Sequence, residues 1–146
     1  MASEGFQSRH AIIPIEIDTK GPKAFSVSVG SIVARFTKEN IEYELNSTCR
    51  MLSRLENLGV MGQPDWKLLT MEVIYVDDSI IPVIPPTLGG FDGGNFKNGS
   101  RKSYRCLSLL LEEKGHKVNN DLAGVDDPKS VEDVIRRNQE WLLNSV

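Results

Sequence analysis

Residues 41–58, IEYELNSTCRMLSRLENL, decide whether this chain is built mainly on strands or on helices. The Glu, Leu, Arg and Met residues of this stretch favour a helix, and Gly59 would suit its end. Its apolar side chains, however, fall at odd positions, at Ile41, Tyr43, Leu45, Cys49, Met51 and Leu55. Among the even positions from 42 to 56 only Leu52 is apolar. A period of two is typical of a strand, so we predict one long strand here.

The segments next to this strand continue the same pattern. Residues 59–65, GVMGQPD, are typical of a hairpin loop, and residues 66–76, WKLLTMEVIYV, indicate a second long strand. Asp77 and Asp78 close that second strand in this prediction. Two long neighbouring strands joined by a short loop favour an antiparallel pair.

Two more strands are predicted upstream. Residues 10–18 are rich in Ile, and Pro14 within them indicates an edge strand or a bulge. Residues 24–36 alternate between apolar and small polar side chains, and Gly30 indicates a bulge or a bend. One face of this strand carries the large side chains Phe25, Val27, Val29 and Val33.

The second half of the chain changes character. Residues 82–99 contain three prolines and five glycines, which excludes a regular element. A loop of this length is usually a lid, a binding loop or a mobile segment, and Phe91 and Phe96 within it could cover an apolar cavity. The alternative is a plain connector. Helices follow at 101–114, capped by Ser100 and stopped by Gly115, and at 128–143, with Asp127 and Pro128 at its start. Strands followed by helices predict an α+β fold, with an antiparallel sheet covered by helices on one face.

Composition narrows the function classes. The chain has 146 residues, which suits a single domain, and a net charge of −3 with no basic stripe, which argues against nucleic acid as a partner. We expect no membrane span, because no apolar run approaches about 18 residues. The first ten residues lack the apolar core of a signal peptide, so we expect a cytoplasmic protein with Cys49 and Cys106 reduced. Two histidines without metal-ligand spacing predict no metal site.

Four stretches together resemble the SnoaL-like proteins of the nuclear-transport-factor-2-like superfamily. They are SRHAIIPIEID, DWKLLTMEVIYVDDSIIPVIP, SYRCLSLLLEEKGHKVNNDLAGVDDP and SVEDVIRRNQEWL, which span roughly residues 6–146. The resemblance implies a strongly curved antiparallel sheet that forms a cone round an apolar cavity, packed by helices, two of them C-terminal. It also implies an activity: that of a cofactor-free polyketide cyclase, isomerase or dehydratase, which acts on a polycyclic substrate of secondary metabolism.

The sequence departs from this family at its beginning. Family members start with a pair of helices that carry a Tyr or Asp facing the cavity, and no counterpart precedes His10. We therefore expect the C-terminal helices or a partner chain to fill the cone, or the chain to be a shortened form. Without such cover the sheet would expose a large apolar face, so a homodimer is expected.

Five residues are candidates for catalysis. His10 stands where the family's dehydratases place a cavity histidine, and an imidazole with a pKa near about 6.5 suits proton transfer from carbon; otherwise it is a solvent-exposed histidine at a strand end. The partner acid of that histidine is missing from residues 28–32. Tyr43 and Tyr104 are candidate hydrogen-bond donors to an oxyanion, or else core tyrosines.

Two charged residues complete the candidate set. Arg35 would stabilise an enolate or carboxylate, or else it is a surface arginine. Glu72 would be a base with a pKa raised by burial if its face of the strand lines the cavity, and a solvated side chain if it does not. Cys49 is expected in the core, because no base stands beside it to activate a nucleophile.

These observations leave two functions open. The first is a cofactor-independent acid–base enzyme that isomerises, cyclises or dehydrates a polycyclic polyketide or terpenoid intermediate in an apolar cavity. The second is a non-catalytic ligand-binding or dimerisation module on the same fold, which the missing acid and missing helices favour. An enclosed apolar pocket lined by His10 and a tyrosine would favour the enzyme.

Overall fold

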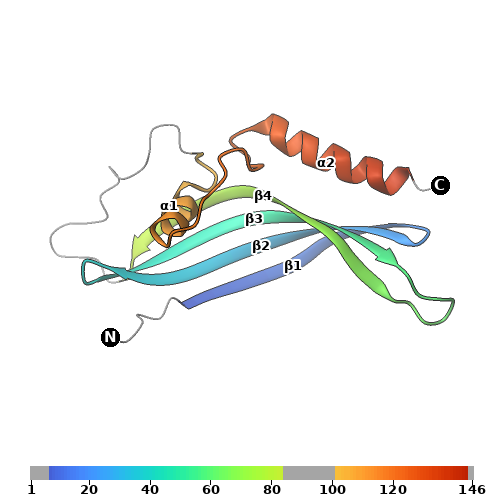
Figure 1. The fold of residues 1–146 in the computed structure, drawn as a ribbon, viewed down its shortest axis with the longest axis horizontal. Helices are drawn as coiled ribbons and strands as arrows, with labels where there is room; N and C mark the ends of the chain where they lie inside the picture. The colour runs from blue at the N-terminus through green and yellow to red at the C-terminus, as the bar shows by residue number, and fades with distance from the viewer. Residues whose placement is uncertain (1–6, 84–100, 145–146) are drawn as a thin grey trace.

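Four long strands and two helices make up the computed structural model, which describes residues 7–83 and 101–144 (Figure 1). The strands form one antiparallel sheet in the order β1 (Gln7–Lys20), β2 (Lys23–Lys38), β3 (Ile41–Asn57) and β4 (Trp66–Pro82). Helices α1 (Arg105–Glu113) and α2 (Pro128–Leu143) follow. The α+β prediction is confirmed. The sheet is open in the described residues and does not close into a cone.

The stretch that decided the fold is a strand along its whole length. β3 covers 41–57 and pairs with β2 on one side and β4 on the other, which is why period two outweighed its helix-forming residues. The hairpin loop after it is also confirmed. The Asn57 side-chain oxygen accepts hydrogen bonds from the backbone N–H groups of Gly59 and Asp65, at 2.9 and 2.8 Å.

Three sequence predictions need correction. β4 does not end at Asp77 but continues to Pro82, because Asp77 and Asp78 still pair with Thr48 and Ser47 of β3. β2 runs through Gly30 without a register shift, so Gly30 is not a bulge; a Cβ there would lie 2.3 Å from the Met51 Cε atom, and a larger residue would require the Met51 side chain to move. α1 begins at Arg105, four residues later than predicted.

Other predictions hold or lie outside the described residues. The register of β1 shifts between Pro14 and Glu16, as Pro14 indicated. α2 has the predicted bounds: the Asp127 side chain accepts a hydrogen bond from the Ser130 N–H, and Gly115 ends the α1 segment with a φ of 86°. The loop prediction for 82–99, with Phe91 and Phe96, and the Ser100 cap concern residues 84–100, which lie outside the described part.

The two helices pack on opposite faces of the sheet, not on one face as predicted. α1 buries Cys106, Leu107 and Leu110 against Ala34 and Leu45. α2 buries Val134 against a separate core, made by Phe25, Leu52 and Ile74. Successive side chains of a strand point to opposite faces, and β2 and β3 pair without any shift, so even-numbered Ala34 and odd-numbered Phe25 face opposite ways. We call these two sides the α1 face and the α2 face.

The helices also lie at opposite ends of the strands. α1 stands over the end with the β2–β3 turn, and α2 runs along the half with the β1–β2 hairpin (Figure 1). The sequence pattern missed this arrangement because it assigned the core of residues 24–36 to one face. Ile32, Ala34 and Phe36, on the other face, form part of the α1 core.

One part of the α1 face has no charged residue and no helix on it among the described residues. It lies at the β1–β2 hairpin end, directly behind the sheet area that α2 covers. We call it the charge-free patch; by register it consists of Ile12, Pro14, Ile17, Thr19, Ala24, Ser26, Ser28, Met51, Ser53, Leu55, Asn57, Trp66, Leu68, Met71 and Val73. Its largest side chains are half-exposed.

The first turn of α1 is capped from the sheet. Its N-cap residue, Tyr104, makes no side-chain capping bond, and the Asp78 carboxylate of β4 instead accepts a hydrogen bond from the Leu107 N–H at 2.8 Å. Burial raises the pKa of Asp78 above its usual range, although this bond and Cys106 act in the opposite direction. The second carboxylate oxygen of Asp78 is buried without a hydrogen-bond partner.

We expect Asp78→Ala to lower the free energy of unfolding by about 1–2 kcal/mol, because the first turn of α1 loses its cap. Asp78→Asn should lose clearly less, because an amide oxygen still accepts the Leu107 N–H and no charge is buried. Urea unfolding at neutral pH measures both values. Equal losses in the two variants would contradict a capping role for Asp78.

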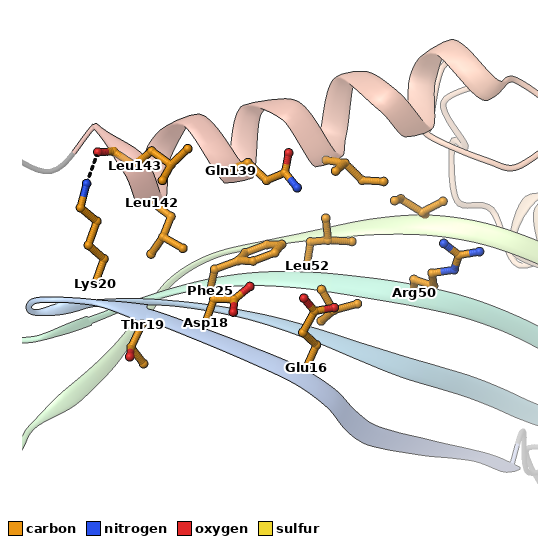
Figure 2. A pocket seen from close by; sticks show the side chains of 13 residues that line it. Glu16, Asp18, Thr19, Lys20, Phe25, Arg50, Leu52, Gln139, Leu142 and Leu143 are labelled. Atoms are coloured by element: carbon orange, nitrogen blue, oxygen red, sulfur yellow. Dashed lines mark hydrogen bonds between the residues drawn. The ribbon is translucent and has the colours of Figure 1, made fainter.

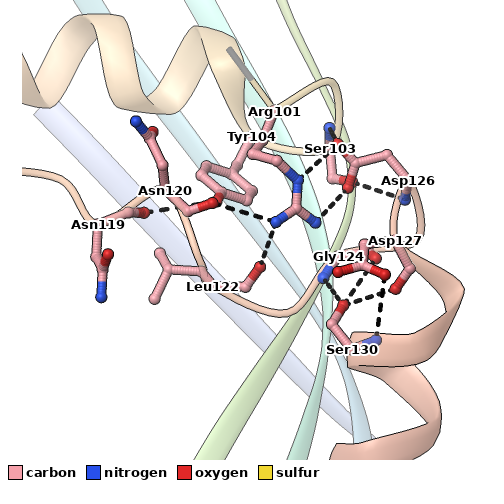
Figure 3. Close-up of polar contacts among 10 residues, drawn as sticks. All are labelled: Arg101, Ser103, Tyr104, Asn119, Asn120, Leu122, Gly124, Asp126, Asp127 and Ser130. Atoms are coloured by element: carbon pink, nitrogen blue, oxygen red, sulfur yellow. Dashed lines mark hydrogen bonds and ion pairs between the residues drawn. The ribbon is translucent and has the colours of Figure 1, made fainter. Parts of the chain in front are cut away.

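The segment between the helices carries the chain round the β4 edge to the other face. At that edge the Tyr75 N–H donates to the Ala123 carbonyl and the Val125 N–H donates to the Tyr75 carbonyl, both at 2.9 Å. The segment is anchored by Arg101, whose guanidinium donates two hydrogen bonds to Asp126, at 3.0 and 2.7 Å (Figure 3). Arg101 also donates to the carbonyls of Asn120 and Leu122, and Ser103 donates to Asp126. This Arg101–Asp126 clamp fixes where α2 starts.

Candidate ligand-binding groove

A groove of about 700 Å³ lies between α2 and the α2 face of the sheet (Figure 2). Its sheet side is formed by Phe25, Val27, Leu52 and Ile74, and α2 adds Ile135, Gln139, Leu142 and Leu143. Period two in the strands and a spacing of three to four residues in α2 bring these side chains to one place. The result is an apolar groove, of a size usual for sites that bind small molecules.

Charged side chains line the same groove. Glu16 and Asp18 of β1 stand two residues apart opposite Val27 and Phe25, and Figure 2 shows both on the groove side of β1. Arg50 of β3 lines it from the sheet. Lys20 also lines the groove, and its ammonium donates to the Leu143 carbonyl of α2 at 2.6 Å (Figure 2). The groove therefore combines an apolar floor with two carboxylates, one guanidinium and one ammonium that is bonded to the end of α2.

A polar network holds α2 over the sheet beside the groove. The Arg54 guanidinium donates to the side-chain oxygen of Asn138 at 2.8 Å, and the buried Asn138 amide donates to Glu72 at 2.7 Å. Arg54 and Lys23 also stand over the ring of Trp141, at 5.5 and 4.9 Å from its centroid. The position of the groove roof thus depends on specific contacts as well as on apolar packing.

Glu72, a candidate base, is part of this network. Burial alone would raise its pKa, but hydrogen bonds from Arg137, at 2.6 Å, and Asn138 outweigh burial, so the pKa lies below its usual value. Of the two alternatives for Glu72, a base whose pKa is raised by burial therefore does not occur. Glu72 faces α2, close to the groove, but it is engaged in holding the helix.

The other candidate residues lie apart from the groove. His10 is exposed on β1 and pairs with Ile32, which places it on the α1 face. Tyr43 is buried on that face and stacks on Phe36 with ring centroids 5.7 Å apart. Arg35 is on the α2 face but at the far end of the sheet, where it pairs with Glu44 at 3.0 Å.

Tyr104 belongs to the packing under α1. It is buried, its ring lies 4.9 Å from the ring of Tyr75, and the Arg101 guanidinium stands 5.5 Å from its centroid. Burial raises its pKa, and its hydroxyl reaches the Asn119 carbonyl at 3.5 Å (Figure 3). The five candidates are thus divided between both faces and do not form one site in the described residues.

The cysteines lie in the core, as expected for Cys49. Both are free and buried, and burial raises the pKa of each thiol, that of Cys106 to about 11. Neither is a thiolate at neutral pH.

Among residues 7–83 and 101–144, no three His, Cys, Asp or Glu side chains gather to hold a metal ion. No helix in the same residues is long and apolar enough to cross a membrane.

Comparison with known proteins leaves the family open. No protein-family model matches the chain, and no curated protein matches it. The SnoaL-like resemblance therefore stays a prediction. Sequence reasoning missed Glu16, Asp18 and Arg50, although the alternation of Glu16, Ile17 and Asp18 placed both acids on one face of β1.

Proposed function

We propose that this protein binds a largely apolar small molecule, of the size of a polycyclic polyketide or terpenoid, in the α2 groove. One observation carries the proposal: a groove of about 700 Å³ joins an apolar floor to a few charged groups. Apolar lining with a small number of polar groups is the usual composition of a ligand site, in which the apolar area supplies affinity and the polar groups orient the ligand.

The charged groups suggest how such a ligand would lie. Glu16 and Asp18 stand on the β1 side of the groove, and Arg50 lies on β3. A hydroxyl or basic nitrogen would therefore face β1, and a carbonyl or carboxylate would face Arg50. The ring system would lie between Phe25 and Leu142.

Acid–base catalysis in this groove is the second candidate function. Two carboxylates facing an apolar floor favour it, because carboxylates positioned beside a bound ligand are suitable groups for general acid–base catalysis. Arg50 would then stabilise an enolate that forms in the groove. Isomerisation, cyclisation and dehydration all need such proton transfers, and none needs a cofactor. The cone-shaped sheet that the family resemblance implies is part of this second proposal.

Binding can be tested with Nile red, an uncharged polycyclic dye, and with two variants on α2. Gln139 lines the groove and is exposed, so Gln139→Trp should fill the groove without disturbing the core. Glu132 is exposed on the same helix outside the groove, so Glu132→Trp is the matched control. We expect saturable binding by the unmodified protein and by Glu132→Trp, and affinity at least about tenfold weaker for Gln139→Trp.

Dye fluorescence titrated against protein concentration measures the three dissociation constants. Equal affinities in the two tryptophan variants would place the dye outside the groove and contradict the proposal. Circular dichroism of each variant shows whether the fold is kept.

A further inference from the structure

Two carboxylates at the rim of the α2 groove have no bonded partner among the described residues. Glu16 and Asp18 project from the same face of β1, two residues and therefore about 6.6 Å apart along the strand. Both line the groove, and neither makes a hydrogen bond or an ion pair with residues 7–83 or 101–144 (Figure 2). Two like charges thus stand side by side without a cation bonded to either.

The far end of the same row of side chains shows what a carboxylate receives where the chain itself compensates it. Through the pairing of the four strands, Glu16 and Glu72 stand at the two ends of one row across the sheet. Glu72 accepts hydrogen bonds from Arg137 at 2.6 Å and from Asn138 at 2.7 Å. No described side chain does the same for Glu16.

The two cations of the groove do not compensate the pair of acids. The Lys20 ammonium donates to the Leu143 carbonyl at the end of α2. Arg50 lies on β3, two strands and about 9.6 Å away from β1, and one row of side chains further from the β1–β2 hairpin than Glu16. A positively charged group that bonds to both acids is therefore missing from the described chain.

We infer that the ligand of the α2 groove carries a primary or secondary amine, protonated at neutral pH, which lies between Glu16 and Asp18. The inference rests on the proposed function and names the chemical class of its ligand. An ammonium group with two or three N–H donors can bond to both carboxylates, whereas a hydroxyl has one hydrogen to donate and serves only one of them. Hydrogen bonds between two charged groups are also about twice as strong as neutral ones.

The position of the acids at the rim favours an organic cation. β1 is exposed along its length, so an ammonium beside Glu16 keeps part of its water shell while the apolar body of the ligand enters the groove. A metal ion would make no use of the apolar floor, and no third acidic, histidine or cysteine side chain joins the two carboxylates in the described residues. The ligand class that fits both the acids and the floor is an apolar amine.

Three pyrene derivatives with one ring system test the preference: the cationic pyrenemethylamine, the uncharged pyrenemethanol and the anionic pyrenecarboxylate. Titration of pyrene fluorescence at neutral pH and low salt measures each dissociation constant. We expect the amine to bind at least about fivefold more tightly than the alcohol, because it forms two exposed ion pairs that each contribute modestly. In Glu16→Gln/Asp18→Asn this advantage should disappear, while the affinity for the alcohol stays the same.

Glu42→Gln/Glu132→Gln is the matched control, because it removes two carboxylates from exposed positions outside the groove. It should keep the preference for the amine, which would show that the net charge of −3 is not its cause. Circular dichroism of both double variants shows whether the fold is kept.

The outcomes separate this inference from the proposed function. Equal affinities for amine and alcohol, or an amine preference that persists in Glu16→Gln/Asp18→Asn, would overturn the inference and leave an uncharged ligand in the groove. Tightest binding of the carboxylate would overturn it as well and give Arg50 the main part in anchoring the ligand. Absence of binding by all three compounds would contradict the proposed function itself, and the inference with it.

Discussion

Asp126→Asn is expected to lower the free energy of unfolding by about 2–3 kcal/mol at neutral pH. Only 18% of the Arg101 side chain and 16% of the Asp126 side chain is exposed, so the change leaves a guanidinium with little access to water and no carboxylate beside it. The same guanidinium anchors the carbonyls of Asn120 and Leu122. The loss should therefore reach the whole segment that leads to α2.

The pH dependence of stability should change in the same variant. Hydrogen bonds from Arg101, and then from Ser103, hold the pKa of Asp126 well below its usual value, although burial opposes them. A depressed carboxyl pKa contributes stability that is complete above the unfolded-state pKa of about 3.9 and is lost as the pH falls below it. The unmodified chain should lose stability from about pH 5 downward, and Asp126→Asn should lose less of it over that range.

Urea unfolding at several pH values between about 7 and 3 measures both effects. Asp65→Asn is the control, because the ion pair of Asp65 with Lys67 is more than half exposed and should contribute below about 1 kcal/mol. The clamp would lose its assigned role if Asp126→Asn were no less stable than Asp65→Asn, or if its acid dependence matched that of the unmodified chain.

Glu16→Gln is expected to slow proton transfer by about a hundredfold or more if the groove is catalytic. The reason is position: the Glu16 carboxylate faces the apolar floor, while the imidazole of His10 is exposed on the other face of the same strand. Exchange of deuterium into the carbon beside the carbonyl of a bound polycyclic ketone reports the transfer without knowledge of the natural product. Mass spectrometry follows the exchange.

His10→Ala is the matched variant for this experiment, because both residues belong to β1. We expect its exchange rate to equal that of the unmodified protein. Loss of exchange in His10→Ala alone would return catalysis to the histidine and to the α1 face. Absence of exchange above the solvent rate in every protein would leave ligand binding as the function of the groove.

Strand-level structure was predictable because it depends on local periodicity. The apolar alternation of residues 41–58 outweighed their helix propensity, and Pro14, Asp127 and Gly115 marked a bulge, a helix start and a helix end. The end of β4 was missed because consecutive aspartates are typical of a turn. Here Asp78 stays in the ladder and caps α1, a role that arises from tertiary contact and leaves no local pattern.

The candidate site was predicted less well than the fold. His10, Tyr43 and Tyr104 were chosen for their side-chain chemistry, but the face that each occupies follows from register and helix placement. Residues 24–36 contain apolar side chains of both parities, so sequence alone did not show that two cores exist. Without that knowledge, Glu16 and Asp18 were ordinary acidic residues of an edge strand. The groove that they line exists because α2 packs on their side of the sheet.

Because α1 and α2 pack on separate cores, we expect α2 to open locally without unfolding of α1. Local opening of α2 would expose the Phe25–Ile74 layer and leave the α1 core intact. If the groove binds a ligand as proposed, lifting α2 alone would admit one that is larger than the groove. The free-energy cost is that of breaking the contacts of α2 alone, and it lies well below the free energy of unfolding the whole chain.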